Sequence, residues 1–257
     1  MLSKADTHIH TTYSDGKASP EELIDYVVER TDLRVIAITD HDTAEGAIAG
    51  REYALRHKAP LEVIVAQEVT TDEGDIVGLF LHKSLPAYHS ARAAIDAIHA
   101  QGGLAIAVHP FSGWVTSGKM TGVGFRLRAL PLDGVEVHNG YPTNLLSNLL
   151  AAWVNRRGRQ VSELGGSDSH VPFTVGQGCT WFPGATAADL RQAILRRQTR
   201  AAGPFWTPRS IAAAIPMLWR RGMPSMEKNL VYGDELPRRP NAPASQPLQM
   251  GKLSREP

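Results

Sequence analysis

The chain has 257 residues, of which 42% are apolar, and its formal net charge is +1. This length suits one large α/β barrel or one to two smaller domains, and the apolar fraction is sufficient for a sizeable core. The near balance of charge excludes a strongly basic nucleic-acid coat protein and an acidic disordered chain, and the single cysteine, Cys179, excludes an internal disulfide framework.

Predicted strands and helices alternate along most of the chain. Short runs rich in valine and isoleucine predict strands over residues 5–9, 35–39, 62–66, 76–81, 104–108, 134–137 and 160–164. Helical periodicity predicts helices over residues 20–30, 44–56, 89–100, 144–156 and 186–197. The first helix has a clear start, because Ser19 can cap it, Pro20 suits its first position and Glu22 completes a capping box.

This alternation indicates a fold class. Strands that are apolar throughout and alternate with helices are typical of a mainly parallel sheet. Repeated over about 200 residues, the pattern favours a closed α/β barrel of the TIM type over an open sheet. In such a barrel the active site lies at the C-terminal face of the strands.

The alternating pattern ends near Trp206. We therefore predict a barrel domain over residues 1–205 and an extension over residues 206–257, of which residues 233–257 are predicted to be disordered. Residues 191–257 carry a formal charge of +8 and residues 1–190 carry −7, so the chain combines an acidic body with a basic C-terminal segment. Neither a signal peptide nor a membrane-spanning segment is predicted, and the expected location is the cytoplasm.

Histidine and carboxylate side chains follow the predicted strands at their C-terminal ends. They are His8 and His10, Asp40 and His41, Glu68, His109, His138, and Asp168 and His170. Each of these taken alone is more often a structural residue than a ligand, but their joint occurrence at the ends of six strands favours one common site. By contrast, His57, His89 and His99 are interpreted as structural or surface residues, and His82 is left open.

The residue types limit the choice of metal ion and of reaction. Imidazole nitrogen with carboxylate oxygen and no thiolate suits zinc, manganese or iron. The number of histidines exceeds the need of one ion, so two or three divalent ions are expected, with Glu68 able to bridge two of them. Such ions generate a metal-activated hydroxide near neutral pH and bind phosphoryl oxygens, which favours phosphoester hydrolysis.

An ordered set of motifs resembles the PHP (polymerase and histidinol phosphatase) family of metal-dependent phosphoesterases, in its small stand-alone form. The motifs are Asp6-Thr7-His8-Ile9-His10-Thr11, Ser14-Asp15-Gly16, Thr39-Asp40-His41-Asp42, Glu68, His109-Pro110 and Gly166-Ser167-Asp168-Ser169-His170. The resemblance runs from about residue 3 to about residue 200, and it implies a distorted seven-stranded (β/α) barrel that holds up to three metal ions.

The resemblance also implies a role for each ligand. His8, His10, Glu68 and Asp168 would hold the first ion. Glu68 would bridge to a second ion, held by His109 and His138, and Asp15, His41 and His170 would hold the third. Asp6 and Asp40 would orient these ligands from behind. The residues expected to act in catalysis are His8, His10, Asp15, His41, Glu68, Asp168 and His170.

Two features bear on the substrate. Many stand-alone relatives carry histidine where this chain has Asp75, at the start of the fourth predicted strand. If that histidine helps to select nucleotide substrates, Asp75 argues against the same specificity here. The loop over residues 111–128 follows a ligand-bearing strand and contains Lys119 and Arg126, which are candidates for binding phosphate, although solvated surface charge is the commoner explanation.

The leading hypothesis is a phosphatase or phosphodiesterase acting on a small phosphorylated substrate. A second hypothesis is a 5′-3′ or 3′-5′ exonuclease that trims RNA or DNA ends, with the basic segment contacting phosphates. A third is a scaffold that binds a partner or a membrane surface through residues 211–221, which are apolar with a basic end. A helix docked on the barrel is the favoured explanation of that segment, and Pro216 weakens both interpretations because it interrupts a helix.

Overall fold

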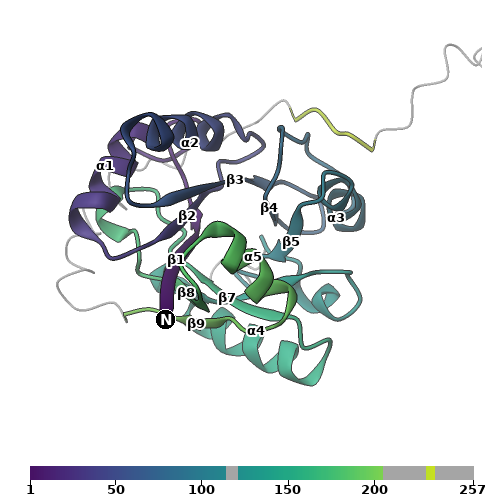
Figure 1. Cartoon of the computed structure of the whole chain (residues 1–257). Helices are drawn as coiled ribbons and strands as arrows, with labels where there is room; N and C mark the ends of the chain where they lie inside the picture. Colours follow the sequence, from purple (N-terminus) through teal and green to yellow (C-terminus); the bar gives the residue numbers. More distant parts are fainter. Residues whose placement is uncertain (114–120, 205–229, 235–257) are drawn as a thin grey trace, which may run out of the picture.

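The computed structural model describes residues 1–113, 121–204 and 230–234. In these residues nine strands form one sheet of order β7-β6-β5-β4-β3-β2-β1-β8-β9 (Figure 1). The strands are β1 (Leu2–Ile9), β2 (Val35–Ile38), β3 (Glu62–Val69), β4 (Ile76–Leu79), β5 (Leu104–Ala107), β6 (Gly134–Asn139), β7 (Ser162–Gly166), β8 (Cys179–Pro183) and β9 (Arg200–Ala202).

The sheet curls into a nearly closed barrel. Residues at the ends of β1 and β7 meet through a parallel bridge between Ile9 and Ser169, and the His10 amide donates to the Ser169 carbonyl over 2.8 Å. The polar residues that follow these two strands are therefore brought together at one end of the barrel.

The predicted count of seven strands is wrong, although every predicted strand is present as one of β1–β7. The missed strands are β8, a five-residue segment that ends in a proline, and β9, a three-residue segment that is partly exposed. Neither carries the long apolar run from which a strand is predicted.

The sheet is also less parallel than predicted. The pairs β3–β4, β4–β5, β1–β8 and β8–β9 are antiparallel. A parallel connection needs a crossover of about a dozen residues or more, and residues 70–75 are too few to provide one between β3 and β4. As a result, the first residue of β4 lies at the same end of the barrel as Glu68, whereas a parallel strand would have its last residue there.

Five α-helices accompany the described part of the sheet: α1 (Pro20–Arg30), α2 (Glu45–His57), α3 (Ala91–Ala100), α4 (Leu145–Arg157) and α5 (Ala187–Leu195). The predicted start of α1 is confirmed, because Ser19 and Glu22 form the reciprocal bonds of a capping box. Short 3-10 turns lie at η1 (Gly124–Arg128), η2 (Pro142–Asn144) and η3 (Pro172–Thr174).

Two layers of buried apolar side chains stabilise the barrel, one on each face of the sheet. The outer layer lies between strands and helices and includes Ile36 and Ile76, whereas the inner layer fills the barrel and includes Ile64 and Val77. Leu190 of α5 belongs to the inner layer, and Figure 1 shows α5 within the ring of strands. Because α5 hydrogen-bonds the starts of β3 and β5 through Ala187 and Arg191, it closes the end of the barrel opposite the histidine-bearing strand ends.

The C-terminal extension is described over residues 230–234 only. The Ala87 amide donates to the Val231 carbonyl and the Gly233 amide to the Ala87 carbonyl, and the Asp234 carboxylate accepts from the His89 amide. The remainder of the extension, including residues 211–221, lies outside the described residues, so the domain boundary and the scaffold hypothesis stay predictions. No helix in the described ranges is long and apolar enough to cross a membrane.

Candidate metal centre

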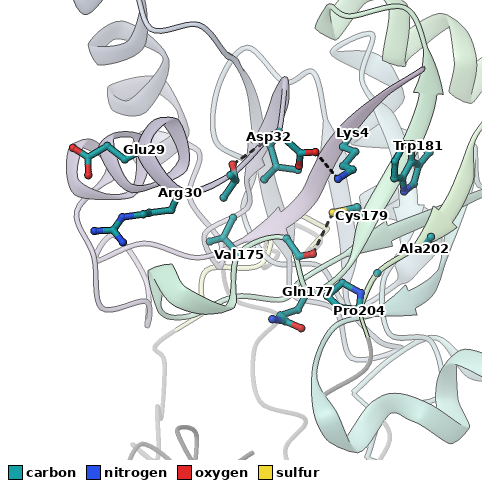
Figure 2. A pocket seen from close by; sticks show the side chains of 14 residues that line it. Lys4, Glu29, Arg30, Asp32, Val175, Gln177, Cys179, Trp181, Ala202 and Pro204 are labelled. Carbon is teal, nitrogen blue, oxygen red and sulfur yellow. Dashed lines mark hydrogen bonds and ion pairs between the residues drawn. The ribbon is translucent and has the colours of Figure 1, made fainter. Parts of the chain in front are cut away.

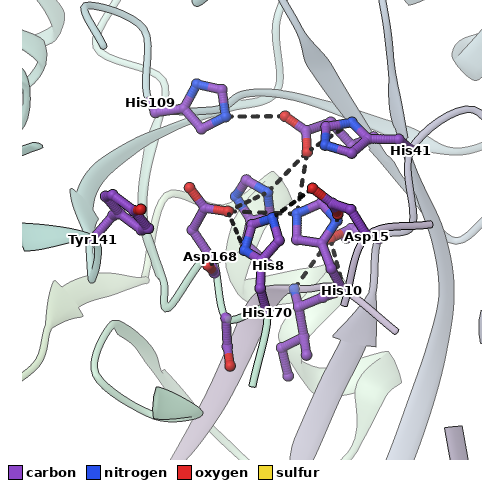
Figure 3. Close-up of polar contacts among 12 residues, drawn as sticks. His8, His10, Asp15, His41, His109, Tyr141, Asp168 and His170 are labelled. Carbon is purple, nitrogen blue, oxygen red and sulfur yellow. Dashed lines mark hydrogen bonds and ion pairs between the residues drawn. The ribbon is translucent and has the colours of Figure 1, made fainter. Parts of the chain in front are cut away.

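Eight of the nine predicted metal ligands come together at one end of the barrel (Figure 3). They form three overlapping groups, in each of which the ligand atoms all lie within 4.8 Å of one another. The groups are His10, Asp15, His41 and His170; His8, His10 and Asp168; and His8, Glu68 and His109.

Glu68 lies between these groups. Its Oε1 atom is 2.9 Å from Nε2 of His109, and its Oε2 atom is 3.2 Å from Nε2 of His8 and 3.3 Å from Nε2 of His10. The side chain is buried, being only 1% exposed. Its two oxygens face different imidazoles, which is the arrangement of a carboxylate that bridges two ions.

Asp168 and His170 complete the cluster from the loop after β7. Asp168 Oδ1 lies 3.4 Å from Nε2 of His10, and His170 Nε2 lies 3.2 Å from Oδ2 of Asp15. The Nδ1 atom of His170 lies 2.9 Å from the Asp168 carbonyl, so a proton on Nδ1 leaves Nε2 as the ligand atom.

Unusual backbone conformations direct two ligands into the cluster. His109 and Asp168 have φ angles of 28° and 54°, in a region that residues other than glycine rarely adopt. Each residue lies two positions after the last residue of a strand, and the change of backbone direction there turns its side chain over the end of the barrel. Local strain of this kind is concentrated at functional sites.

Asp6 and Asp40 act on the backbone that carries the ligands. Asp6 accepts hydrogen bonds from the amides of Ser167 and Gly176, and so joins β1 to the loop after β7. Asp40 accepts from both the amide and the hydroxyl of Thr11, at 2.7 and 2.6 Å. In this structure both carboxylates hold the ligand-bearing segments in place through the backbone.

Glu136 of β6 is a participant that the sequence prediction missed. Its Oε1 atom lies 3.2 Å from Nδ1 of His8, and its Oε2 atom accepts from the His109 amide over 2.8 Å. The residue is 1% exposed. A charged residue inside an apolar strand indicates a functional or structural partner nearby, because a buried charge requires one. Glu136 could have been identified on this ground.

Glu136→Gln is expected to weaken metal binding by about 10- to 100-fold, because the carboxylate fixes the tautomer of His8 and raises its basicity. The amide keeps an acceptor for His8 but loses the charge. Competition titration against a chromogenic chelator measures the affinity. Glu163→Gln on β7 is the matched control, since Glu163 pairs with Arg156 at the surface; equal affinities in the two variants would refute this role for Glu136.

Two predicted site residues are not brought into the cluster, and a third cannot be placed. His138 lies on β6 with its Nε2 atom 3.3 Å from the Gln177 carbonyl, and it belongs to none of the three groups. Arg126 lies in η1 and forms an ion pair with Glu73 at 3.4 Å. Lys119 lies outside the described residues.

The charges in the cluster shift one another's pKa values. Burial acts to lower the pKa of His10 and His109, but the neighbouring carboxylates of Asp168 and Glu68 raise the pKa of His10, and the hydrogen bond to Glu68 raises that of His109, both to about 9. Burial acts to raise the pKa of Glu68 and Asp168, but the surrounding imidazoles hold both well below the ordinary range. The carboxylates therefore stay ionised in a buried place, which favours cations.

Imidazole nitrogens without hydrogen-bond partners also indicate that the cluster binds metal ions. Both ring nitrogens of His10 and Nδ1 of His109 are buried, and among the described residues no hydrogen bond satisfies them. Buried polar atoms without partners are costly in a folded protein. Buried ring nitrogens that face carboxylates without forming hydrogen bonds are the arrangement expected of metal ligands.

A separate cavity lies outside the barrel, between α1 and strands β8 and β9 (Figure 2). Lys4 and Asp32 form an ion pair at its wall, and the Cys179 thiol donates to the Gly176 carbonyl. Burial raises the pKa of Cys179, so its thiol is not a ready nucleophile. The cavity contains none of the predicted ligands, and the chemistry is concentrated in the metal centre.

Known proteins resemble the chain in two segments. A family model described as PHP domain matches residues 6–110, and one described as PHP-associated matches residues 149–199. Uncharacterized protein MJ1587 of Methanocaldococcus jannaschii is 37% identical over 159 residues, which cover 58% of this chain and 88% of that protein.

Two further relatives are matched over part of their length. The 5′-3′ exoribonuclease Rnm of Salmonella typhimurium is 41% identical over 86 residues, 32% of this chain and 29% of the relative. A two-domain protein of Bacteroides vulgatus, described as containing a predicted PHP-like metal-dependent phosphoesterase, superposes with a TM-score of 0.63 at 21% identity. That superposition covers 79% of this chain and 65% of the other, and it shows a shared fold.

Proposed function

Because the chain belongs to the PHP domain family, we propose that it is a metal-dependent hydrolase of phosphoester bonds that acts on a small phosphorylated substrate. The observation that carries this proposal is the position of Glu68, whose Oε1 atom faces His109 and whose Oε2 atom faces His8 and His10. A bridging carboxylate among histidines serves the paired ions of phosphoester hydrolysis.

The three groups divide the proposed ligands among two or three divalent ions, with zinc, manganese and iron as the candidates. His8, His10, Glu68 and Asp168 would hold one ion, and Glu68 and His109 a second. Asp15, His41 and His170 would hold a third. Ions in such a site lower the pKa of water and offset the charge of phosphoryl oxygens.

The protein's own residues prepare this chemistry. Glu136 holds His8 through Nδ1 so that Nε2 faces the centre, and the Asp168 carbonyl does the same for His170. Asp6 and Asp40 keep the two ligand-bearing loops in place. Since α5 covers the other end of the barrel in the described residues, we expect substrate to approach the centre from the histidine-bearing end.

A metal and substrate screen tests the proposed function. The purified chain, supplied separately with manganese, zinc or iron, is assayed on a chromogenic phosphate monoester, phosphorylated metabolites and nucleoside 3′,5′-bisphosphates. We expect hydrolysis that requires an added ion and is lost in Asp168→Ala. Hydrolysis that persists unchanged in Asp168→Ala, or its absence with every ion and substrate, would contradict the proposal.

Metal affinity is expected to rise with pH between about 6.5 and about 9. His10 and His109 have a pKa near 9 in the metal-free protein, above the ordinary value of 6.5, so they are protonated below pH 9. An ion must displace those protons, which makes affinity increase roughly tenfold per pH unit for each proton released.

The same shift stabilises the metal-free fold, fully below pH 6.5 and progressively less as the pH rises through about 9. Calorimetric titration in buffers of different ionisation enthalpy counts the protons released on binding. Binding that releases no proton between pH 7 and pH 8 would contradict the assignment of these two imidazoles as ligands.

A second candidate function is exonuclease activity on RNA or DNA ends. It is favoured by the similarity to a protein named 5′-3′ exoribonuclease and by the +8 charge of residues 191–257. If the basic segment contacts the nucleic acid backbone, cleavage of a 5′-phosphorylated oligoribonucleotide should fall steeply with salt while monoester hydrolysis does not. Equal salt dependence of the two activities would show that residues 191–257 do not contact the nucleic acid backbone.

A further inference from the structure

Tyr141 is a half-buried tyrosine at the metal-bearing end of the barrel, in the turn between β6 and η2. Figure 3 shows its side chain beside the cluster, on the side where Asp168 lies. Its hydroxyl forms no hydrogen bond within the described ranges, since the bond that Tyr141 makes to Asn139 comes from its backbone amide. The side chain is therefore placed at the centre without a structural partner for its polar atom.

Two buried asparagines fix the position of Tyr141. The Tyr141 amide donates to Oδ1 of Asn139 over 2.9 Å, and the Asn144 side chain donates to the same oxygen over 2.8 Å. Both asparagines are 2% exposed. The Nδ2 atom of Asn139 donates to Oε2 of Glu136 over 2.8 Å and to Oδ2 of Asp168 over 3.3 Å. One side chain thus holds the backbone of Tyr141, the carboxylate of Glu136 and the predicted ligand Asp168 together.

Asn139 couples the place of Tyr141 to the orientation of Asp168. Because Asn139 engages Oδ2 of Asp168, the Oδ1 atom is the oxygen turned to the imidazoles, at 3.4 Å from Nε2 of His10 and 3.7 Å from Nε2 of His8. A residue held by the same side chain that orients a metal ligand is fixed relative to whatever the ion binds. Tyr141 is therefore pre-organised towards a substrate at the metal centre.

Other hydroxyl groups on the ligand-bearing segments are already engaged. Those that donate to internal carboxylate or carbonyl oxygens are Thr11, Ser14, Ser167 and Ser169. Arg126, which was predicted to contact phosphate, pairs with Glu73. A phosphoryl group has more oxygen atoms than the ions alone neutralise, and donors placed at those oxygens stabilise them. The Tyr141 hydroxyl has no competing acceptor of its own in the described ranges.

Resting on the proposed phosphoester hydrolysis, we propose that the Tyr141 hydroxyl donates a hydrogen bond to a non-bridging phosphoryl oxygen of the substrate. Those oxygens carry the negative charge of the transferred group, and a charged acceptor strengthens the bond. A neutral phenol makes this contact without placing a further positive charge beside the divalent ions, as a lysine or an arginine would.

Tyr141→Phe tests this contact, because it removes the hydroxyl and keeps the ring. With the ion that gives the highest activity, we expect kcat/KM for a phosphate monoester to fall about 10- to 100-fold, as for the loss of one hydrogen bond to a charged group. Metal content by elemental analysis and melting temperature should equal those of wild type. Tyr53→Phe is the matched control, since the Tyr53 hydroxyl donates to Asp25 of α1, and it should keep wild-type kcat/KM.

Two substrates locate the contact on the phosphoryl group. 4-Nitrophenyl phosphate and glycerol phosphate share the non-bridging oxygens and differ in the leaving oxygen, so Tyr141→Phe should lower kcat/KM by the same factor on both. A loss confined to glycerol phosphate would place the hydroxyl at the leaving oxygen and overturn the assignment.

Other results would also overturn the assignment of Tyr141. Wild-type kcat/KM in Tyr141→Phe would do so, and so would a loss of bound metal or a lower melting temperature that accounts for the fall in activity. A wild-type chain that hydrolyses no phosphoester with any ion would instead contradict the proposed function itself.

Discussion

Glu68→Gln is expected to lower phosphoester turnover by about 10³-fold or more, since bridged ions contribute several kcal/mol to transition-state stabilisation. Both carboxylate oxygens of Glu68 face imidazoles, Oε1 at 2.9 Å from His109 and Oε2 at 3.2 Å from His8. Glutamine keeps the size of the side chain, but either orientation of its amide directs an NH₂ group at one ligand set. Steady-state assays with saturating manganese or zinc measure the loss.

Glu62→Gln is the matched control for this variant. Glu62 begins the same strand, β3, is exposed, and accepts from the Ala187 amide at the opposite end of the barrel. We expect it to retain wild-type turnover. Turnover in Glu68→Gln within tenfold of wild type, at equal metal content, would show that Glu68 does not bridge ions.

Removal of the metal is expected to abolish turnover and to lower the melting temperature. Binding of an ion present at 1,000 times its Kd stabilises a fold by about 4 kcal/mol, which corresponds to roughly 10 °C for a chain of this size. The direction follows from the ligands, because eight side chains from separate strands and loops are held together only in the folded state. Differential scanning fluorimetry with and without a chelator measures the shift.

A chelator already saturated with the same ion is the control for metal removal. It should leave both turnover and melting temperature unchanged, and re-addition of manganese to the stripped protein should restore both. Stripped protein that melts at the same temperature as loaded protein would contradict binding at this cluster.

Most of the candidate site was predictable because its ligands lie where strands end. An apolar strand leaves its first polar residues at the barrel rim, and this rule alone collects His8, His41, Glu68 and His109. The rule needs only the position of each strand end and not the direction of its neighbours. It therefore held although half of the strand pairings are antiparallel.

His138 and Glu136 show where the rule fails. The two residues are two apart on β6, so an undisturbed strand would direct both to the same side. The pairing of β6 with β7 changes register between them, and a bulge of this kind turns the following residues. Glu136 therefore reaches His8 inside the barrel, and His138 faces Gln177. A register shift depends on the partner strand and cannot be read from β6 alone.

Asp75 was noticed in the sequence only as a departure from a family pattern. Its place beside the metal centre follows from the antiparallel run of β4, which follows from the short connection over residues 70–75. The length of that connection was visible in the sequence. The antiparallel direction of β4 could be inferred from that length only if β3 and β4 were known to be neighbours in the sheet.

The central claim is that the cluster around Glu68 holds the divalent ions of a phosphoesterase. Anomalous diffraction from crystals of the manganese-loaded chain tests it most directly, together with an ester hydrolysis assay on the same preparation. We predict anomalous peaks on both sides of the Glu68 carboxylate in protein that hydrolyses the ester. Active protein with no anomalous peak beside Glu68 would contradict the claim.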